Sequence, residues 1–265
     1  MSTESAPIGR VLVDDEALVR VVTISNPTKK NALSRAMLDA LARALVLDES
    51  SPIRAIVLTG DRAGGAFSAG FDVTSIDDDE RARGLDPIAP VTEALRRSTR
   101  PIVAAIDGPC MGGALEIALA CTVRVSSSGA RFLMPPARLG LVYARSGLET
   151  FLSRLAPGQV ARLFLAAEPL DAAEASRIGL VDVRVDEPRA AIDEARRLAA
   201  RMAEGAPLAV RGMTTAIHRH RSGAGFADDD ARLVDELRAR SLASNDLQEG
   251  VRAFREKRPP TFRGE

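Results

Sequence analysis

Short apolar runs alternate with amphipathic segments along the first half of the chain. Runs of Val, Ile and Leu bounded by turn residues are typical of buried strands, and they predict four of them, at 11–13, 18–24, 53–59 and 102–106. The acidic stretch 14–16 is the expected turn between the first two. Ser34 is placed to cap a helix that reaches about Asp48. One face of that helix would carry the apolar residues Met37, Leu38, Leu41 and Leu45.

The order strand, glycine-rich turn and helix recurs in the first two thirds of the chain, which predicts an α/β fold. The remainder is nearly all helical in its periodicity, with helices expected at 189–202, 208–218, 228–242 and 247–257. Asn245 with Gln248 is the expected capping pair of the last helix. We therefore expect a β-rich core domain at 1–186 and a helical region at 187–265.

Composition argues against several kinds of partner. The formal net charge is +0 and only 3% of residues are aromatic, with no Trp, so no nucleic-acid partner is expected. Cys110 and Cys121 are expected to be buried thiols in a reducing compartment, and without clustered His they predict no metal site. Because no apolar run has membrane-spanning length and residues 1–10 carry no targeting signal, we expect a soluble, cytoplasmic protein with no membrane partner.

The segment 110–116, Cys-Met-Gly-Gly-Ala-Leu-Glu, joins the strand at 102–106 to an apolar helix. Gly112 and Gly113 at such a turn leave backbone N–H groups accessible at the positive end of the helix dipole. This arrangement predicts a binding place for a negative oxygen. Glu116 is a lone carboxylate in an apolar helix, which is costly unless it is paired, neutral or used in chemistry. The alternative is a tightly packed glycine pair with Glu116 satisfied by a nearby Arg.

A second glycine-rich segment, 64–72, follows the strand at 53–59. Together the two loops resemble the paired oxyanion loops of the crotonase (enoyl-CoA hydratase/isomerase) superfamily. The resemblance covers nearly the whole chain, through the segments 26–33, 55–60, 67–72, 101–116, 139–141, 178–181 and 249–258. It implies a crotonase-like spiral of ββα units followed by a C-terminal helical trimerisation region. It also implies a homotrimer, or a hexamer built as a dimer of trimers.

Members of the resembled superfamily bind an acyl-CoA substrate, and two backbone N–H groups stabilise the enolate oxygen of its thioester. By motif, these oxyanion-hole donors are Phe71 and Gly113, and Glu116 is the acid/base carboxylate. The resemblance also implies CoA-binding positions at Lys29, Lys30, Ala32, Ala69, Asp72, Phe254 and Lys257. It implies no metal and no cofactor beyond the CoA moiety of the substrate.

One departure from the superfamily concerns the second glutamate that its hydratases use. Pro136 stands at that position and has neither a titratable group nor an N–H. Ala144 stands where dienoyl isomerases have an aspartate. The stretch 136–143 instead resembles the methylmalonyl-CoA decarboxylase branch, which places Tyr143 at the acyl end of the pocket. A phenol there can hold a carboxylate or pass a proton, and a core aromatic with a satisfied hydroxyl is the alternative.

The likeness to the decarboxylase is incomplete, because Phe71 replaces a His of that enzyme. Arg138 and Arg145 could recognise a carboxylate in its place, or they could be surface charges.

Three further groups of polar residues are expected to lie at the surface. The acidic run 77–81 is read as a solvated loop, and Glu149 is expected to face solvent. His218 and His220 are read as exposed helix residues rather than catalytic ones.

Three functions are compatible with these residues. The preferred one is an acyl-CoA lyase, a hydratase in which Glu116 is the only retained carboxylate. The second is decarboxylation of a malonyl-type CoA thioester with Tyr143, because loss of CO₂ yields the same enolate without a strong base. The third is a non-catalytic acyl-CoA-binding protein, motivated by Pro136 and Phe71 at positions where relatives carry reactive side chains. The sequence leaves the acyl group open.

Overall fold

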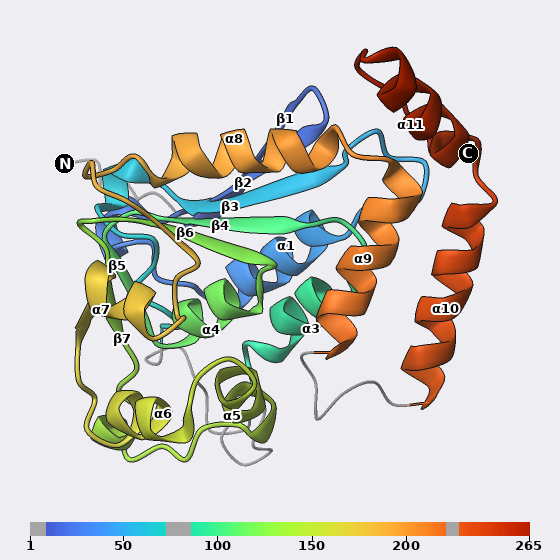
Figure 1. Cartoon of the computed structure of the whole chain (residues 1–265). Helices are drawn as coiled ribbons and strands as arrows, with labels where there is room; N and C mark the ends of the chain where they lie inside the picture. The colour runs from blue at the N-terminus through green and yellow to red at the C-terminus, as the bar shows by residue number, and fades with distance from the viewer. Residues whose placement is uncertain (1–8, 73–85, 221–227) are drawn as a thin grey trace.

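A six-stranded sheet runs through the middle of the computed structural model, which describes residues 9–72, 86–220 and 228–265 (Figure 1). Its strands, in spatial order, are β1 (Arg10–Glu16), β2 (Val19–Ser25), β3 (Ala55–Gly60), β4 (Ile102–Ile106), β6 (Val123–Ser127) and β9 (Val183–Val185). β1 pairs antiparallel with β2, and all the other neighbours are parallel. Helices therefore connect most strands and cover both faces, which explains the almost wholly buried β3 and β4.

A second, smaller sheet supports the turn that opens α4. It contains β5 (Pro109–Met111), β7 (Arg131–Leu133) and β8 (Leu170–Asp171). β5 and β7 are parallel, whereas β7 and β8 are antiparallel. An isolated bridge between Ser68 and Cys110 joins the first glycine-rich loop to this sheet. The two glycine-rich segments of the chain consequently lie side by side.

Helices pack on both faces of the large sheet (Figure 1). One face carries three of them: α1 (Arg35–Leu45), α3 (Ala89–Arg97) and α4 (Gly113–Ala120). Their apolar residues pack on strand residues that point the same way, such as Ile56 and Ile102. The other face carries α8 (Ala191–Ala203), whose buried alanines recur every four residues and pack on Val57 and Val103. Their small side chains let α8 lie close to the sheet.

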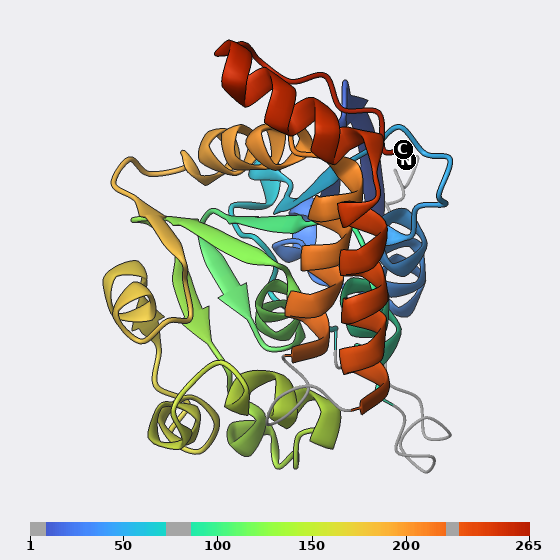
Figure 2. The same cartoon turned by 45° about the vertical axis from the view of Figure 1, so that its right-hand side comes forward.

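The remaining helices are α5 (Arg145–Leu152), α6 (Pro157–Phe164), α7 (Ala172–Arg177), α9 (Pro207–His220), α10 (Asp228–Leu242) and α11 (Asn245–Glu256). Short 3-10 helices are η1 (Pro27–Lys29), η2 (Arg62–Gly64) and η4 (Pro136–Leu139). Figure 1 and Figure 2 both show α10 alongside α9, and α11 at the end of the molecule opposite α5 and α6. Among the described residues, no helix is both long enough and apolar enough to cross a membrane.

The α/β fold with C-terminal helices is confirmed. β4 and α10 have the predicted bounds, and Ser34 caps α1 by accepting a hydrogen bond from the Met37 N–H at 3.3 Å. The buried state of the two cysteines is also confirmed. α8 lies beyond residue 186 and packs on the sheet, and the division of the chain at that residue stays a prediction.

Two local predictions are wrong. Residues 14–16 continue β1 instead of turning, because Asp15 pairs with Arg20 across the hairpin at 2.7 Å, and the reversal occurs at Ala17 with φ 52°. Ser244, not Asn245, caps α11 by accepting from the Leu247 N–H at 3.1 Å. β5, β7, β8 and β9 have only two or three residues each, which is too short for periodicity to reveal. The acidic run 77–81 lies outside the described residues.

Candidate active site

Two glycine turns meet at the N-terminus of α4. Gly112 has φ 54° and ψ −128°, and its N–H donates to the Leu133 carbonyl at 2.9 Å. Gly70 has φ 89°, and a Cβ on it would lie 2.5 Å from the Met111 carbonyl oxygen. Both conformations strain any residue with a side chain, and Gly70 has no room for one. The sequence therefore needs glycine here for conformational reasons as well as for close approach.

The turns bring the backbone N–H groups of Phe71 and Gly113 together. A Cβ on Gly113 would lie 3.9 Å from the Phe71 nitrogen, and a Cβ on Gly70 would lie 3.4 Å from the Gly113 nitrogen. Neither N–H donates a hydrogen bond within the described residues. The Ile88 side chain covers Gly113, with its Cδ1 only 2.6 Å from where a Cβ would be. Two neighbouring donors at a helix N-terminus can stabilise an oxygen that gains negative charge.

Several predicted CoA-binding positions lie on two adjacent segments, namely Lys29, Lys30, Ala32, Ala69 and Asp72. The Ala69 N–H donates to the Lys30 carbonyl at 3.0 Å, and the Asp72 N–H donates to the Leu33 carbonyl at 2.9 Å. The Lys29 ammonium pairs with the Asp72 carboxylate at 2.9 Å. The structure thus brings these positions to one edge of the Phe71 loop.

The side chain of Asn31 holds these segments together, a role that the sequence analysis did not predict. Its fully buried side chain donates to the carbonyls of Asp61 and Ala66 at 2.9 and 2.7 Å and accepts from the Asn26 N–H at 3.0 Å. Its φ is 56°, a left-handed conformation that Asn tolerates better than most residues. That tolerance is a sequence signal that could have indicated the role.

Glu116 is buried, at 1% exposure, one turn into α4. Its Oε2 accepts a hydrogen bond from the Tyr143 hydroxyl at 2.6 Å, and its Oε1 has no partner among the described residues. Burial raises the pKa of Glu116 to about 7, opposed by the Tyr143 hydrogen bond. The charge of Asp86 raises this pKa further, and that of Arg96 lowers it. The carboxyl therefore changes charge near neutral pH, as an acid/base group must.

Tyr143 precedes α5 and reaches back to α4. Its ring packs edge-on against Phe164 of α6, with centroids 5.4 Å apart. Burial and the negative charge of Glu116 raise the pKa of Tyr143 well above its usual value. The phenol consequently stays protonated at neutral pH and acts as a donor to Glu116.

Gly147 is a second site residue whose role the sequence did not reveal. A Cβ there would lie 2.4 Å from Cε1 of Tyr143 and 2.9 Å from Oε2 of Glu116. Only glycine lets α5 approach the pair this closely. Pro136 is buried in η4 and Ala144 precedes α5, and neither side chain has a titratable group that could act as an acid or base.

Two arginines considered for carboxylate recognition lie at the surface. Arg145 is 86% exposed and pairs with Glu149 at 2.5 Å. Arg138 is exposed and donates to the Ala166 carbonyl at 3.4 Å. The structure therefore supports the surface-charge reading, and Glu149 is exposed as predicted.

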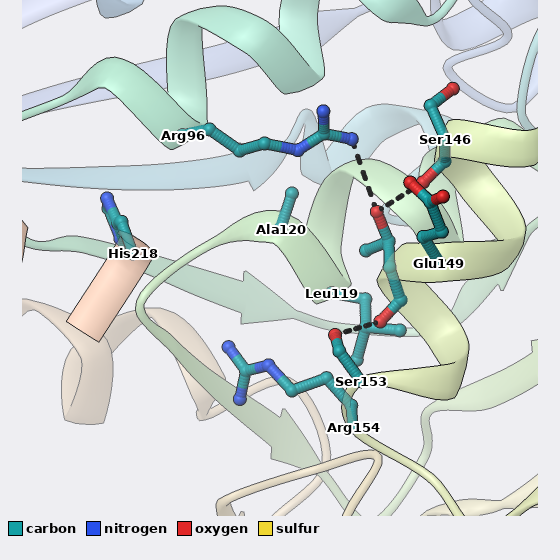
Figure 3. Close-up of a pocket in the computed structure, with 9 residues that line it drawn as sticks. Arg96, Leu119, Ala120, Ser146, Glu149, Ser153, Arg154 and His218 are labelled. Atoms are coloured by element: carbon teal, nitrogen blue, oxygen red, sulfur yellow. Dashed lines mark hydrogen bonds between the residues drawn. The ribbon is translucent and has the colours of Figure 1, made fainter. Parts of the chain in front are cut away.

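The prediction of an exposed His218 is wrong, whereas that for His220 is confirmed. His218 is buried at the edge of a cavity between α3, α4, α5 and α9 (Figure 3). Its Nδ1 lies 3.1 Å from the Ser98 carbonyl and its Nε2 lies 3.0 Å from the Thr122 hydroxyl. Because a carbonyl only accepts, Nδ1 carries a proton and donates to Ser98. Its position links α9 to the core.

Phe254 and Lys257 are not brought to the other predicted CoA-binding positions within one chain. They lie on and directly after α11, and the Phe254 side chain is 85% exposed. No group of His, Cys, Asp or Glu side chains within the described ranges is arranged to hold a metal ion.

Known proteins are similar to this chain over nearly its whole length. The model of the enoyl-CoA hydratase/isomerase family matches residues 14–265. A short-chain-enoyl-CoA hydratase of Clostridium acetobutylicum is 31% identical over 95% of this chain and 96% of its own length. The methylmalonyl-CoA decarboxylase of Escherichia coli is 28% identical over 93% of this chain and 95% of its own.

Solved structures give the same result. The crystal structure of an enoyl-CoA hydratase from Mycobacterium marinum superposes with a TM-score of 0.80 at 32% identity, covering 97% of this chain and 100% of that one. The chain therefore belongs to the enoyl-CoA hydratase/isomerase family of the crotonase superfamily, whose enzymes act on acyl-CoA thioesters.

Proposed function

We propose that the chain is an acyl-CoA lyase that hydrates an enoyl-CoA with Glu116 as its acid/base carboxylate. The observation that carries the proposal is the state of the Glu116 carboxyl. One oxygen is held by Tyr143 at 2.6 Å, and the other has no partner among the described residues. A buried carboxyl is costly to leave half-satisfied, so the free oxygen is best explained by a substrate or a water that it contacts during the reaction.

The oxyanion hole would be formed by the N–H groups of Phe71 and Gly113. When water adds to C3 of an enoyl thioester, negative charge accumulates on the thioester oxygen. Two preorganised donors beside the α4 N-terminus would stabilise that charge without reorganisation. The absence of any other acceptor for these N–H groups among the described residues supports this role.

A single carboxyl can complete the proton transfers. Ionised Glu116 takes a proton from water as the water oxygen bonds to C3, and the π electrons of the C2–C3 bond move to form the enolate. Protonated Glu116 then returns that proton to C2 as the enolate collapses to the thioester. Tyr143 holds Oε2 throughout, which leaves Oε1 to face the reacting atoms. A pKa of about 7 suits both steps, because both charge states are accessible at neutral pH.

Decarboxylation of a malonyl-type thioester is the second candidate, favoured by Tyr143 next to the carboxyl. In that reaction the bond between C2 and the carboxylate breaks and CO₂ leaves. The electron pair of the broken bond stays on the thioester and forms the same enolate, which protonated Glu116 would then protonate at C2. Against it stand Phe71, which offers no side-chain donor, and the surface position of Arg138 and Arg145. A binding-only protein remains the third candidate, and a carboxyl tuned to about 7 argues against it.

We further propose that the CoA moiety lies along the segments of Lys29, Lys30 and Ala32 and of Ala69 and Asp72. Because Phe254 and Lys257 lie away from these segments in one chain, they would reach the CoA only across an interface between copies. The exposed apolar residues of α10 and α11 fit a homotrimer or a dimer of trimers, and they include Leu242, Leu247, Val251 and Phe254.

Mass spectrometry of the protein incubated in parallel with crotonyl-CoA and methylmalonyl-CoA tests the choice between these reactions. Addition of water to crotonyl-CoA supports the hydratase, and loss of CO₂ from methylmalonyl-CoA supports the decarboxylase. The Glu116→Gln variant serves as the matched control for both thioesters. If neither thioester changes while both bind, the hydratase proposal for short enoyl groups is contradicted.

A further inference from the structure

Residues of opposite charge lie at the two ends of helix α3, and the charges of both act on Glu116. Asp86 stands three residues before α3, and Arg96 is in its last turn. Both side chains border one cavity together with Ser146 of α5. α3 lies beside α4, so these charges flank the helix that carries Glu116 (Figure 1).

Asp86 connects the start of α3 to the start of α5. One of its oxygens accepts from the Ile88 N–H at 3.0 Å, and the other accepts from the Ser146 hydroxyl at 3.3 Å. Ile88 packs over Gly113, and Gly147, the neighbour of Ser146, lies against Glu116. A single carboxylate thus ties together the residues that cover the N–H pair and the residues that cover the carboxyl.

Arg96 makes the corresponding connection one turn further along α5. Its guanidinium donates to the Thr150 hydroxyl at 3.3 Å, and Thr150 in turn donates to the Ser146 carbonyl at 3.0 Å. Figure 3 draws a second cavity, which shares Arg96 and Ser146 with the first. There Arg96 extends from α3 toward α5, on which Ser146 lies. α5 is therefore held at both ends of α3, by the negative Asp86 through Ser146 and by the positive Arg96 through Thr150.

We propose that Asp86 and Arg96 are opposed electrostatic positioning residues, which hold α5 against Glu116 and bias the charge of its carboxyl in opposite directions. This inference deepens the proposed function, because it concerns the group assigned as its acid/base. Neither residue is required to touch substrate.

The directions of the electrostatic effects agree with this arrangement. Asp86 raises the pKa of Glu116 and that of Tyr143, and Arg96 lowers the pKa of Glu116. Burial remains the largest cause for both groups.

Other charged groups of the described residues face this region from the neighbouring elements. Arg35 of α1 and Glu93 of α3 border the same cavity as Asp86. Glu149 of α5, paired with Arg145, borders the cavity of Figure 3 together with Arg154 and the titratable side chain of His218. Among the described residues, only Asp86 and Arg96 change the pKa of Glu116 appreciably through their charge.

The chain itself supplies a probe for the test, because Tyr143 is its single Tyr and it has no Trp. A phenol that donates to a carboxylate is quenched more strongly than one that donates to a neutral carboxyl. Tyrosine fluorescence should therefore fall as pH rises through the pKa of Glu116, without any substrate present. Asp86→Asn and Arg96→Gln remove one charge each and keep a hydrogen-bonding amide. Arg97→Gln, on the same helix but with a side chain 77% exposed, is the matched control.

We expect the midpoint of the titration to fall by about half a pH unit or more in Asp86→Asn and to rise by a similar amount in Arg96→Gln. Arg97→Gln should leave it unchanged, and Arg96→Lys, which keeps the charge, should restore it. Equal midpoints in all variants, or shifts of the same sign, would overturn the proposal. Because the readout needs no turnover, opposite shifts in a protein that converts no thioester would uphold this inference and contradict the proposed reaction instead.

Discussion

The Tyr143 hydroxyl donates a 2.6 Å hydrogen bond to Oε2 of Glu116, and this contact joins α4 to the segment that precedes α5. It satisfies one oxygen of a carboxyl that is otherwise buried among apolar residues of α4. Burial makes the neutral form of Glu116 more favourable, and the phenol favours the charged form. The balance leaves a carboxyl that can both take and give a proton near pH 7.

Replacing Glu116 by Gln should abolish turnover while thioester binding persists. The amide keeps the shape of the side chain but cannot exchange a proton, so the rate should fall about 10²- to 10⁴-fold. Steady-state kinetics with the thioester that the wild type converts, together with calorimetric binding, measure both effects. Glu149→Gln removes an exposed carboxylate from α5 and should leave the rate unchanged. A Glu116→Gln enzyme with full activity would remove the basis of the mechanism.

The same Glu116→Gln substitution should stabilise the protein at high pH only. The folded-state pKa of Glu116 is raised from 4.5 to about 7, so its stabilising contribution is complete below 4.5 and is lost as pH rises through 7. Above that range the wild type bears a cost of about 3 kcal/mol that Gln does not. Chemical denaturation at pH about 5 and about 8 should show the gap in unfolding free energy widening with pH. A gap independent of pH would contradict the raised pKa.

Tyr143→Phe should move the titration of Glu116 upward. The Tyr143 hydrogen bond lowers the pKa of Glu116, so its loss raises that pKa above about 7. The limb of the pH–rate profile that reports ionised Glu116 should shift to higher pH, and Oε2 would lose its described partner. An unchanged profile would mean that the phenol does not act on the carboxyl. If the reaction is decarboxylation, CO₂ release should also slow.

Gly147→Ala should impair both activity and stability. Its Cβ would lie 2.4 Å from the Tyr143 ring and 2.9 Å from Oε2 of Glu116, so α5 must move away from α4. We expect a loss of about 1–3 kcal/mol in unfolding free energy and a lower kcat. Gly158→Ala in α6 is the control, because a Cβ there meets nothing within 4 Å. Thermal unfolding should show Gly147→Ala to be less stable than Gly158→Ala. Similar stability of the two variants would argue against the close packing of α5 on α4.

Gly70→Ala should lower the rate by misplacing the Phe71 N–H. A Cβ there would approach the Met111 carbonyl to 2.5 Å, at a φ of 89°. Loss of one oxyanion donor typically lowers kcat about 10²- to 10³-fold. Gly65→Ala imposes similar backbone strain at φ 64° in open space, so it should cost stability without a comparable loss of rate. Equal rates in the Gly70→Ala and Gly65→Ala variants would mean that the Phe71 N–H takes no part in catalysis.

Local sequence signals predicted the parts of the site that depend on local conformation. The glycine turns at Gly70 and Gly112 require backbone angles that only glycine adopts easily. The position of Gly112 before an apolar helix indicated accessible N–H donors, whereas the pairing of Gly113 with the Phe71 N–H came from the resemblance to the crotonase superfamily. A single carboxylate among apolar residues likewise indicated a buried, perturbed Glu116. The strands β3 and β4 could be predicted from the sequence because both faces of each are buried, which gives a continuous apolar run.

Contacts between distant elements were not predictable in the same way. Glu116 and Tyr143 are 27 residues apart, and their contact depends on how α5 docks on α4. The burial of His218 was not predicted because α9 carries polar residues over much of its surface. The partners of His218, Ser98 and Thr122, lie 120 and 96 residues away in sequence. Asp86 gave no sequence signal, since its importance lies in Ser146 across the cavity.

The most direct test of the central claim is a pH titration of tyrosine fluorescence in the wild type and in Glu116→Gln. Tyr143 is the chain's single Tyr, so the signal reports on the group that contacts Glu116. We predict a fall in fluorescence with a midpoint at about pH 7 in the wild type, and a flat signal over the same range in the variant. A midpoint near the ordinary value of 4.5, or the same transition in both proteins, would contradict a carboxyl tuned for proton transfer at this site.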